Sequence, residues 1–232
     1  MKNKVICIIP ARGGSKRIPR KNIRDFLGKP IIAYSIETAL KSNLFDEVMV
    51  STDDKEIAEV AREYGAEVPF FRSKDTSNDI ATTAEVINEV FLEYKKLGKE
   101  FEYFSCLYPT APFVTIEKLI KAFDILKLNN LDSVVPVVKF NYPIQRGLKI
   151  DDNLIKMIWS ENLNKRSQDL QPTYHDCGQF YFMETESFLK QKKLFTEKSA
   201  PLFINEMEAQ DIDNEDDWKL AESKYKIINK ID

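Results

Sequence analysis

Short apolar runs and longer amphipathic segments alternate along the chain. Runs rich in β-branched and aromatic residues are typical of strands buried on both faces, and they occur at residues 5–9, 48–50, 67–71, 103–107, 132–138 and 178–183, with a last extended segment at 203–207. Apolar residues at helical spacing predict helices at 31–41, 55–64, 84–97, 115–128 and 215–228. This alternation predicts an α/β fold, with a mostly parallel sheet covered by helices on both faces.

One region departs from the alternation. Residues 139–176 are polar and irregular, with turn signals at Tyr142-Pro143, Gly147 and Asp151-Asp152-Asn153. We interpret them as a hairpin-like insertion, the flap, in a single domain spanning residues 1–232; it either reaches a partner subunit or is a surface excursion. Apolar residues in a segment with little core of its own favour packing on a second copy, hence a homodimer; they are Phe140, Tyr142, Ile144, Leu148, Ile150 and Trp159.

Composition narrows the classes of function. A chain of 232 residues with 43% hydrophobic content can bury one sizeable core. A net charge of −3 argues against general nucleic-acid binding, and no apolar run approaches the roughly 18 residues of a membrane span. Three widely spaced cysteines in strand-like segments predict reduced, buried thiols and a cytoplasmic protein. A single histidine excludes a multi-histidine metal site, and the charged helix at 215–228 is expected to be solvated surface.

The first strand leads into the phosphate loop, residues 11–22. Gly13 and Gly14 let the backbone adopt conformations closed to other residues, so that amides can converge on an anion. Five cations suited to phosphate follow the strand: Arg12, Lys16, Arg17, Arg20 and Lys21. Open α/β sheets bind ligands where such strands end, which favours a polyphosphate site over a merely exposed basic loop. The pattern is neither a P-loop nor a dinucleotide fingerprint.

A second candidate site lies near the C-terminus, at Asp211-Ile212-Asp213. In an extended chain residues two apart point the same way, so the two carboxylates face together while Ile212 faces the core. Adjacent carboxylates repel unless a cation lies between them, and their oxygens together with nucleotide phosphates suit Mg²⁺. The alternative is that Asp213 or Asn214 caps the following helix, and Asp213 is able to serve both purposes.

The phosphate loop resembles the start of the sugar-nucleotide cytidylyltransferases, the CMP-sialic acid synthetase family, in the run from Ile9 to Lys16 and in Lys21-Asn22. The resemblance extends nearly end to end and includes the late Asp-x-Asp. It implies a three-layer, Rossmann-like nucleotidyltransferase fold and a metal role for Asp211 and Asp213. It also implies nucleotide contacts from Ala11, Arg12, Gly13, Gly14, Ser15, Lys16, Lys21 and Asn22.

Two further segments match this family. Arg72 and the later Ala81-Thr82-Thr83 resemble the segment that holds cytosine and ribose, although helix capping alone also accounts for the two threonines. Tyr108-Pro109-Thr110-Ala111-Pro112 resembles the segment at the sugar site, which implies that Tyr108 contacts the sugar. Relatives usually follow that segment with arginine, and this chain has Phe113, which argues against ordinary sialic acid as the substrate.

The flap carries the remaining resemblance. The piece that begins at Arg166 and the piece Tyr174-His175-Asp176-Cys177-Gly178 resemble the branch that acts on pseudaminic acid. Arg166 is expected to grip the carboxylate of a 2-keto acid through two parallel hydrogen bonds, the alternative being a surface salt bridge. His175 and Asp176 are expected to hydrogen-bond substituents of the sugar, although a structural histidine fits equally well.

Together these segments imply a reaction between CTP and a nonulosonic acid, with pseudaminic acid as the expected substrate, that gives a CMP-sugar and pyrophosphate. Arg12 and Lys16 are the expected triphosphate contacts, and Mg²⁺ on Asp211 and Asp213 the expected Lewis acid; these four residues form the expected catalytic set. The alternatives are N-acetylneuraminic, legionaminic or 3-deoxy-octulosonic acid as the substrate, or a non-catalytic nucleotide-binding domain.

Overall fold

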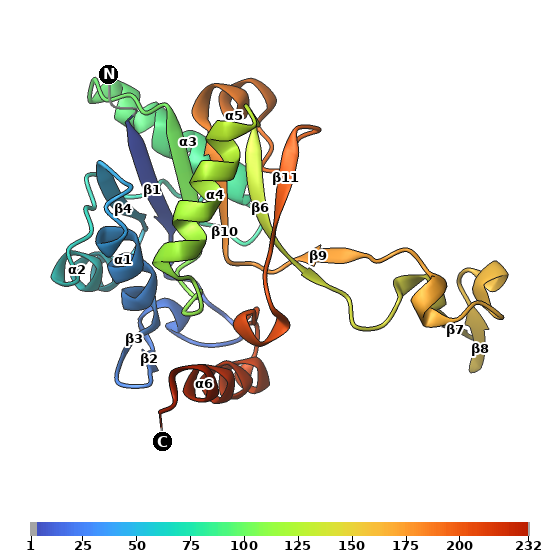
Figure 1. Ribbon diagram of the computed structural model, residues 1–232. Helices are drawn as coiled ribbons and strands as arrows, with labels where there is room; N and C mark the ends of the chain where they lie inside the picture. Colours follow the sequence, from blue (N-terminus) through green and yellow to red (C-terminus); the bar gives the residue numbers. More distant parts are fainter. Residues whose placement is uncertain (1–3, 232) are drawn as a thin grey trace.

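The computed structural model describes residues 4–231. Its centre is a seven-stranded sheet in the order β11-β6-β10-β5-β1-β4, with β9 paired to β6 (Figure 1). The strands are β1 (Val5–Pro10), β4 (Glu47–Ser51), β5 (Tyr103–Leu107), β6 (Ser133–Lys139), β9 (Tyr174–Asp176), β10 (Phe180–Glu184) and β11 (Ser199–Phe203). Two short hairpins lie outside this sheet, β2 (Asp25–Phe26) with β3 (Lys29–Pro30) and β7 (Leu148–Asp151) with β8 (Leu154–Met157).

Five strands of the sheet run in one direction. β1 is parallel to β4 and β5, β11 is parallel to β6, and β10 is antiparallel to both β5 and β6. The mostly parallel sheet is therefore confirmed, with β10 and β9 reversed. The carboxyl ends of β1, β4 and β5 consequently meet at one edge, where parallel sheets place ligand sites.

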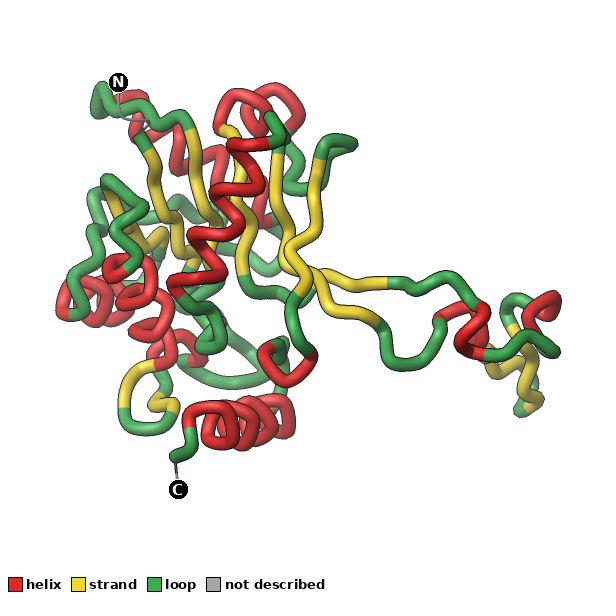
Figure 2. Tube along the Cα trace, viewed as in Figure 1, coloured by secondary structure: helices red, strands yellow, loops and turns green. Residues whose placement is uncertain are grey.

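Helices cover both faces, as Figure 2 shows. α1 (Ile31–Lys41), α2 (Lys55–Glu63) and α4 (Ile116–Leu128) bury their apolar stripes in one core cluster. α3 (Thr83–Lys96) and α5 (Thr185–Gln191) do so in a second cluster on the opposite face. The three-layer α/β arrangement is confirmed, because each helix has one apolar stripe to bury and the central strands have two apolar faces.

Two predicted strands are wrong in detail. Residues 67–71 form only an isolated bridge, between Met49 and Glu67. Pro69 follows at once and has no N–H to continue a ladder. The extended segment placed at 203–207 lies earlier, at β11, and a 3-10 helix at Glu206–Glu208 follows it, with the Asn205 side chain accepting from the Met207 amide at 2.9 Å.

The C-terminal helix α6 (Glu215–Asn229) is not merely solvated surface, which corrects that expectation. Trp218 is only 2% exposed and lies in a third core cluster with Phe26, Phe113 and Ile212. Its indole stacks edge-on against Phe26 at 5.6 Å. In Figure 1 the helix lies beneath the edge of the sheet at which β1 ends. By packing on Ile212 it helps to fix the backbone between the two candidate metal ligands.

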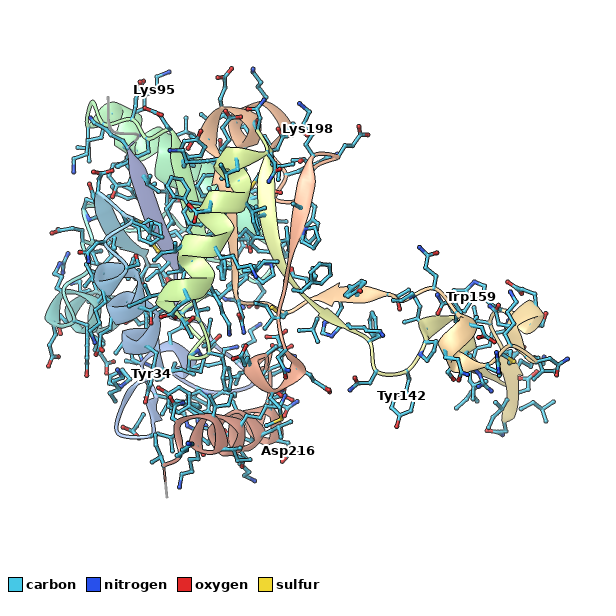
Figure 3. All side chains as sticks on the ribbon, in the orientation of Figure 1. Tyr34, Lys95, Tyr142, Trp159, Lys198 and Asp216 are labelled. Carbon is cyan, nitrogen blue, oxygen red and sulfur yellow. The ribbon has the colours of Figure 1, made fainter. Side chains whose placement is uncertain are left out.

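The flap projects away from the rest of the chain (Figures 1 and 3). It leaves the sheet at β6, forms the β7–β8 hairpin and returns at β9. Figure 3 shows labelled Tyr142 and Trp159 well away from the main body, and Tyr142 is 87% exposed. The other large apolar side chains exposed on it include Leu148, Ile150, Leu154, Ile155, Ile158 and Leu163.

Two further sequence-based expectations concern the cysteines and the membrane. Cys7, Cys106 and Cys177 are all free and buried, as expected. Across the described part of the chain, no helix combines the length and the apolar character needed to cross a membrane.

Candidate active site

Two adjoining cavities open at the sheet edge where β1, β4 and β5 end. The larger, the phosphate cavity, has a volume of about 460 Å³ and is lined by Pro10, Arg12, Ser15, Lys16, Arg17, Ile18, Lys21, Asn22, Asp79, Tyr108, Pro109, Thr110 and Asp213. The smaller, the base cavity, has a volume of about 200 Å³ and is lined by Pro10, Arg12, Arg72, Thr76, Asn78, Asp79, Ala81, Thr83, Val86 and Tyr108. The structure thus brings together residues predicted from three separate segments of the sequence.

The phosphate loop is braced against the end of β4. The Gly13 amide donates to Asp53 Oδ1 at 2.9 Å, and a Cβ on Gly13 would lie only 2.7 Å from Asp54 Oδ2. Asp54 cannot move aside freely, because it caps α2 at the Ile57 amide and accepts from both terminal nitrogens of Arg20, at 2.5 and 3.0 Å. The hydrogen bond from Arg20 lowers the pKa of the Asp54 carboxyl. Gly13 is therefore required for space.

The far end of the loop is tied to the carboxylate segment. Buried Asn22 donates to the Arg12 carbonyl at 3.0 Å, and Lys21 Nζ donates to the Ile212 carbonyl at 2.5 Å. Burial lowers the pKa of Lys21, although Asp213 and Asp211 oppose the shift. Lys21 therefore lies beside both carboxylates and joins the two predicted sites across 191 residues of sequence.

Asp211 and Asp213 flank fully buried Ile212, as the alternating pattern predicts. Asp213 lines the phosphate cavity and pairs with Arg17 at 2.8 Å. Asp211 lines a neighbouring cavity of about 330 Å³, the third cavity, together with His175, Asp176 and Lys224. The pKa of Asp211 is raised, first by burial and then by repulsion from Asp213. The two carboxylates therefore repel one another, and a cation close to both would lower that repulsion.

The donor set fits Mg²⁺ only with a nucleotide present. Within residues 4–231, no three His, Cys, Asp or Glu side chains are grouped as a complete metal site. Mg²⁺ is commonly bound by one or two carboxylates plus substrate phosphates and water. Asp211 and Asp213 would supply the carboxylates, while the phosphate cavity next to Asp213 would place phosphate oxygens within reach.

The predicted cytosine-binding residues play different roles. Arg72 is 8% exposed and is anchored to the Ser51 carbonyl at 2.6 Å, and burial lowers its pKa to about 10. Thr82 caps α3 in a capping box with Glu85, so the capping interpretation holds for this hydroxyl. Thr83 Oγ1 lies 3.2 Å from the Tyr108 hydroxyl, and both side chains line the base cavity.

The sugar-binding predictions are spread more widely. Arg166 lies on the flap with a side chain 72% exposed, pairs with Asp169 at 2.8 Å, and lines none of the three cavities of its own chain. His175 and Asp176 line the third cavity with Asp211. Asp176 already accepts from the Gly178 amide at 2.9 Å and from the Tyr181 hydroxyl.

Phe113, which stands where relatives usually have arginine, does not line these three cavities. It is buried in the third core cluster, with its ring 6.0 Å from that of Tyr225. Its side chain therefore supports α6.

Sequence reasoning missed the acidic partners of the phosphate loop. Asp53 and Asp54 follow β4 directly, and Asp54 caps α2 at the Ile57 amide. Their second role, holding Gly13 and Arg20, depends on contacts between distant segments. Asp79 was also missed, and it pairs with both Arg12 and Lys16.

The fold and the cation-lined cavity define an α/β nucleotidyltransferase-like protein. The chain belongs to the cytidylyltransferase family, whose model matches residues 6–226. Pseudaminic acid cytidylyltransferase of Campylobacter jejuni subsp. jejuni is 42% identical over 228 residues, covering 98% of this chain and 97% of that protein. CMP-N,N'-diacetyllegionaminic acid synthase of Legionella pneumophila subsp. pneumophila is 34% identical over 227 residues, covering 97% of each.

A solved structure is similar in fold. The structure of CMP:2-keto-3-deoxy-manno-octonic acid synthetase complexed with CTP matches with a TM-score of 0.70 at 16% identity, covering 98% of this chain and 99% of that one. The predicted family and fold class are therefore confirmed, and the chain is a cytidylyltransferase.

Proposed function

We propose that this cytidylyltransferase couples CTP to a nonulosonic acid, with pseudaminic acid preferred, and releases pyrophosphate. The observation that carries the proposal is the 42% identity, over nearly all of both chains, to a protein described as a pseudaminic acid cytidylyltransferase. The site supports it, because a cation-lined cavity adjoins a smaller one of mixed polar and apolar lining at the sheet edge.

The reaction is an in-line displacement. The anomeric hydroxyl oxygen of the sugar acid forms a bond to the α-phosphorus of CTP, while the bond from that phosphorus to the bridging oxygen of pyrophosphate breaks. The hydroxyl proton passes to water. Arg12 and Lys16 would neutralise charge on the leaving pyrophosphate, and the braced loop would hold them in place. Asp211 and Asp213 would hold Mg²⁺, which would supply further charge neutralisation when bound.

The base would occupy the smaller cavity. Arg72 is fixed by Ser51, and its cationic head is therefore held in place before any ligand arrives. Ala81, Thr83 and Tyr108 are among the uncharged residues of the lining. Such a pocket disfavours a wrong base by leaving its polar groups unpaired. CTP should therefore be used far better than UTP, ATP or GTP.

We further propose that the enzyme is a homodimer in which the flap carries Arg166 to the site of the second copy. Arg166 lines none of the three cavities described above, and the flap around it exposes many apolar side chains. An exposed apolar surface of this extent is typical of a protein interface. A cytoplasmic location belongs to the same proposal, since CTP is an intracellular metabolite and all three cysteines are free.

A substrate panel tests the sugar assignment. Pyrophosphate release is measured with CTP and pseudaminic, N-acetylneuraminic, legionaminic or 3-deoxy-octulosonic acid. Pseudaminic acid should give the highest kcat/KM. Equal turnover of N-acetylneuraminic acid would refute the preference, and no turnover of any acid would refute the enzyme assignment.

Mixed dimers test the role of Arg166. Arg166→Ala should raise the KM for the sugar acid and leave the KM for CTP nearly unchanged, while Arg166→Lys keeps the charge but loses the planar fork. Lys165→Ala is the matched control. Mixing Arg166→Ala protomers with Asp213→Asn protomers should restore activity, because one site in each mixed dimer is then intact. No recovery on mixing, with mixed dimers shown by mass spectrometry, would place Arg166 in its own chain's site.

A further inference from the structure

One carboxylate, that of Asp79, is paired with both of the cations that are expected to bind the triphosphate. Arg12 Nη1 contacts Asp79 Oδ1 at 2.6 Å, and Lys16 Nζ pairs with Asp79 Oδ2. The same Arg12 nitrogen also donates to the Asn78 carbonyl at 3.0 Å. Two oxygens of a carboxylate held by one guanidinium and one ammonium form the arrangement that a phosphate would make with the same pair. Asp79 therefore takes the position of a ligand.

Asp79 also lies where a nucleotide would have to pass. It lines both the phosphate cavity and the base cavity, which share few other residues. A nucleotide with its base in one cavity and its phosphates in the other would bring several negative charges close to this carboxylate. The two cations cannot keep their contacts with Asp79 and give the same donors to the triphosphate.

The loop that carries Asp79, residues 73–81, is anchored differently at its two ends. Its beginning is held by Glu89 of α3, which accepts from the Ser73 amide at 2.7 Å and also from Thr76. Near the tip, Asn78 Oδ1 accepts from the amides of Ile80 and Ala81, each at 2.8 Å, a contact local to the loop. Ile80 is 90% exposed. Within the described residues, the tip is tied to the body through Arg12 and Lys16.

We propose that Asp79 is a positioning residue that acts through Arg12 and Lys16: it occupies their phosphate position in the free enzyme, and the triphosphate of CTP displaces it. This inference rests on the proposed function, because it takes Arg12 and Lys16 as the triphosphate contacts. Asp79 then keeps the two cations paired when the site is empty, and it sets the affinity for CTP. The loop tip is released when the nucleotide binds, while the Glu89 anchor holds its base.

The effect of Asp79 on the affinity for CTP depends on how often Asp79 is paired with Arg12 and Lys16 in the free enzyme. If the Asp79 contacts are formed about 90% of the time, the apparent Kd for a phosphate ligand is raised about 10-fold. Asp79→Asn removes the charge with little change in volume. It should therefore tighten binding of both CTP and pyrophosphate several-fold, lower the KM for CTP and leave the KM for the sugar acid unchanged.

The experiment is equilibrium titration of the full-length protein with pyrophosphate and with CTP, followed by steady-state kinetics. Asp75→Asn is the matched control, because it removes the same charge from the same loop and its side chain makes no hydrogen bond or ion pair within residues 4–231. Asp79→Glu should stay close to the wild type. If Asp79→Asn fails to fold, Asp79→Ser is measured in its place.

The outcomes separate this inference from the function on which it rests. Tighter pyrophosphate binding by Asp79→Asn, with Asp75→Asn unchanged, supports it. Unchanged or weaker binding by Asp79→Asn overturns it, provided that Arg12→Ala weakens pyrophosphate binding as expected. If Arg12→Ala leaves pyrophosphate binding intact, the phosphates lie elsewhere, and both the site assignment and this inference fail.

Discussion

Gly13→Ala tests whether the phosphate loop is held by close packing. The added Cβ would lie 2.7 Å from Asp54 Oδ2 and 2.9 Å from Asp54 Cβ, distances that real Cβ atoms essentially never show. Asp54 is held by Arg20 and by its cap on Ile57, so the phosphate loop has to move instead. That movement stretches the 2.9 Å hydrogen bond from the Gly13 amide to Asp53.

Gly13→Ala should impair both catalysis and stability, at costs of similar size in free energy. Overpacking costs about 1–3 kcal/mol, and loss of the hydrogen bond costs about 1 kcal/mol. Because movement of the loop reduces the overpacking while it breaks the hydrogen bond, the two costs do not add in full. The unfolding free energy should therefore fall by about 1–3 kcal/mol. A displacement of about 1 Å in a positioning element reduces the rate about 100-fold, so kcat/KM for CTP should fall by about that factor. Urea denaturation and a pyrophosphate-release assay measure the two quantities.

Gly14→Ala is the control for stability. A Cβ at Gly14 meets nothing within 4 Å, and its φ is not in the left-handed region. Replacing this glycine should leave the unfolding free energy unchanged or raise it by up to about 1 kcal/mol, because alanine restricts the unfolded chain. If Gly13→Ala matched the wild type in both stability and kcat/KM, the close contact with Asp54 would not govern the loop.

Three further predictions follow. Arg12→Ala should cost about 2–4 kcal/mol in transition-state stabilisation, measured as kcat/KM for CTP; a near-normal rate would place the phosphates elsewhere. Trp218→Ala should lower the unfolding free energy by about 3–5 kcal/mol in urea denaturation, since this buried ring holds α6 against Ile212; a loss below 1 kcal/mol would contradict that. The raised pKa of Asp211 means that its ionised form opposes folding, so stability falls as pH rises through that pKa. Asp211→Asn should therefore not lower stability at pH 7, and it should abolish Mg²⁺-dependent turnover because it removes a proposed metal ligand. A less stable variant would contradict burial as the cause of the raised pKa.

Local patterns in the sequence were sufficient for most of the fold. The helix predicted at 31–41 and the strand predicted at 103–107 agree with α1 and β5 residue for residue. Burial of Ile212 between two aspartates likewise followed from strand alternation alone. Such features depend on the periodicity of neighbouring residues, which can be read from a single segment of the sequence. The strand predicted at 67–71 failed because pairing also depends on what the neighbouring strand offers and on Pro69.

The arrangement of the site required the tertiary structure. The contact of Lys21 with the Ile212 carbonyl, the clamp of Arg20 on Asp54 and the pairing of Asp79 with Arg12 all join segments far apart in sequence. The sequence predicted the cations as phosphate ligands, and only the fold shows that Arg20 braces the loop and that Arg12 is already paired with an aspartate. A charged side chain does not encode its partner, because many opposite charges are available along the chain and packing decides which one lies within reach.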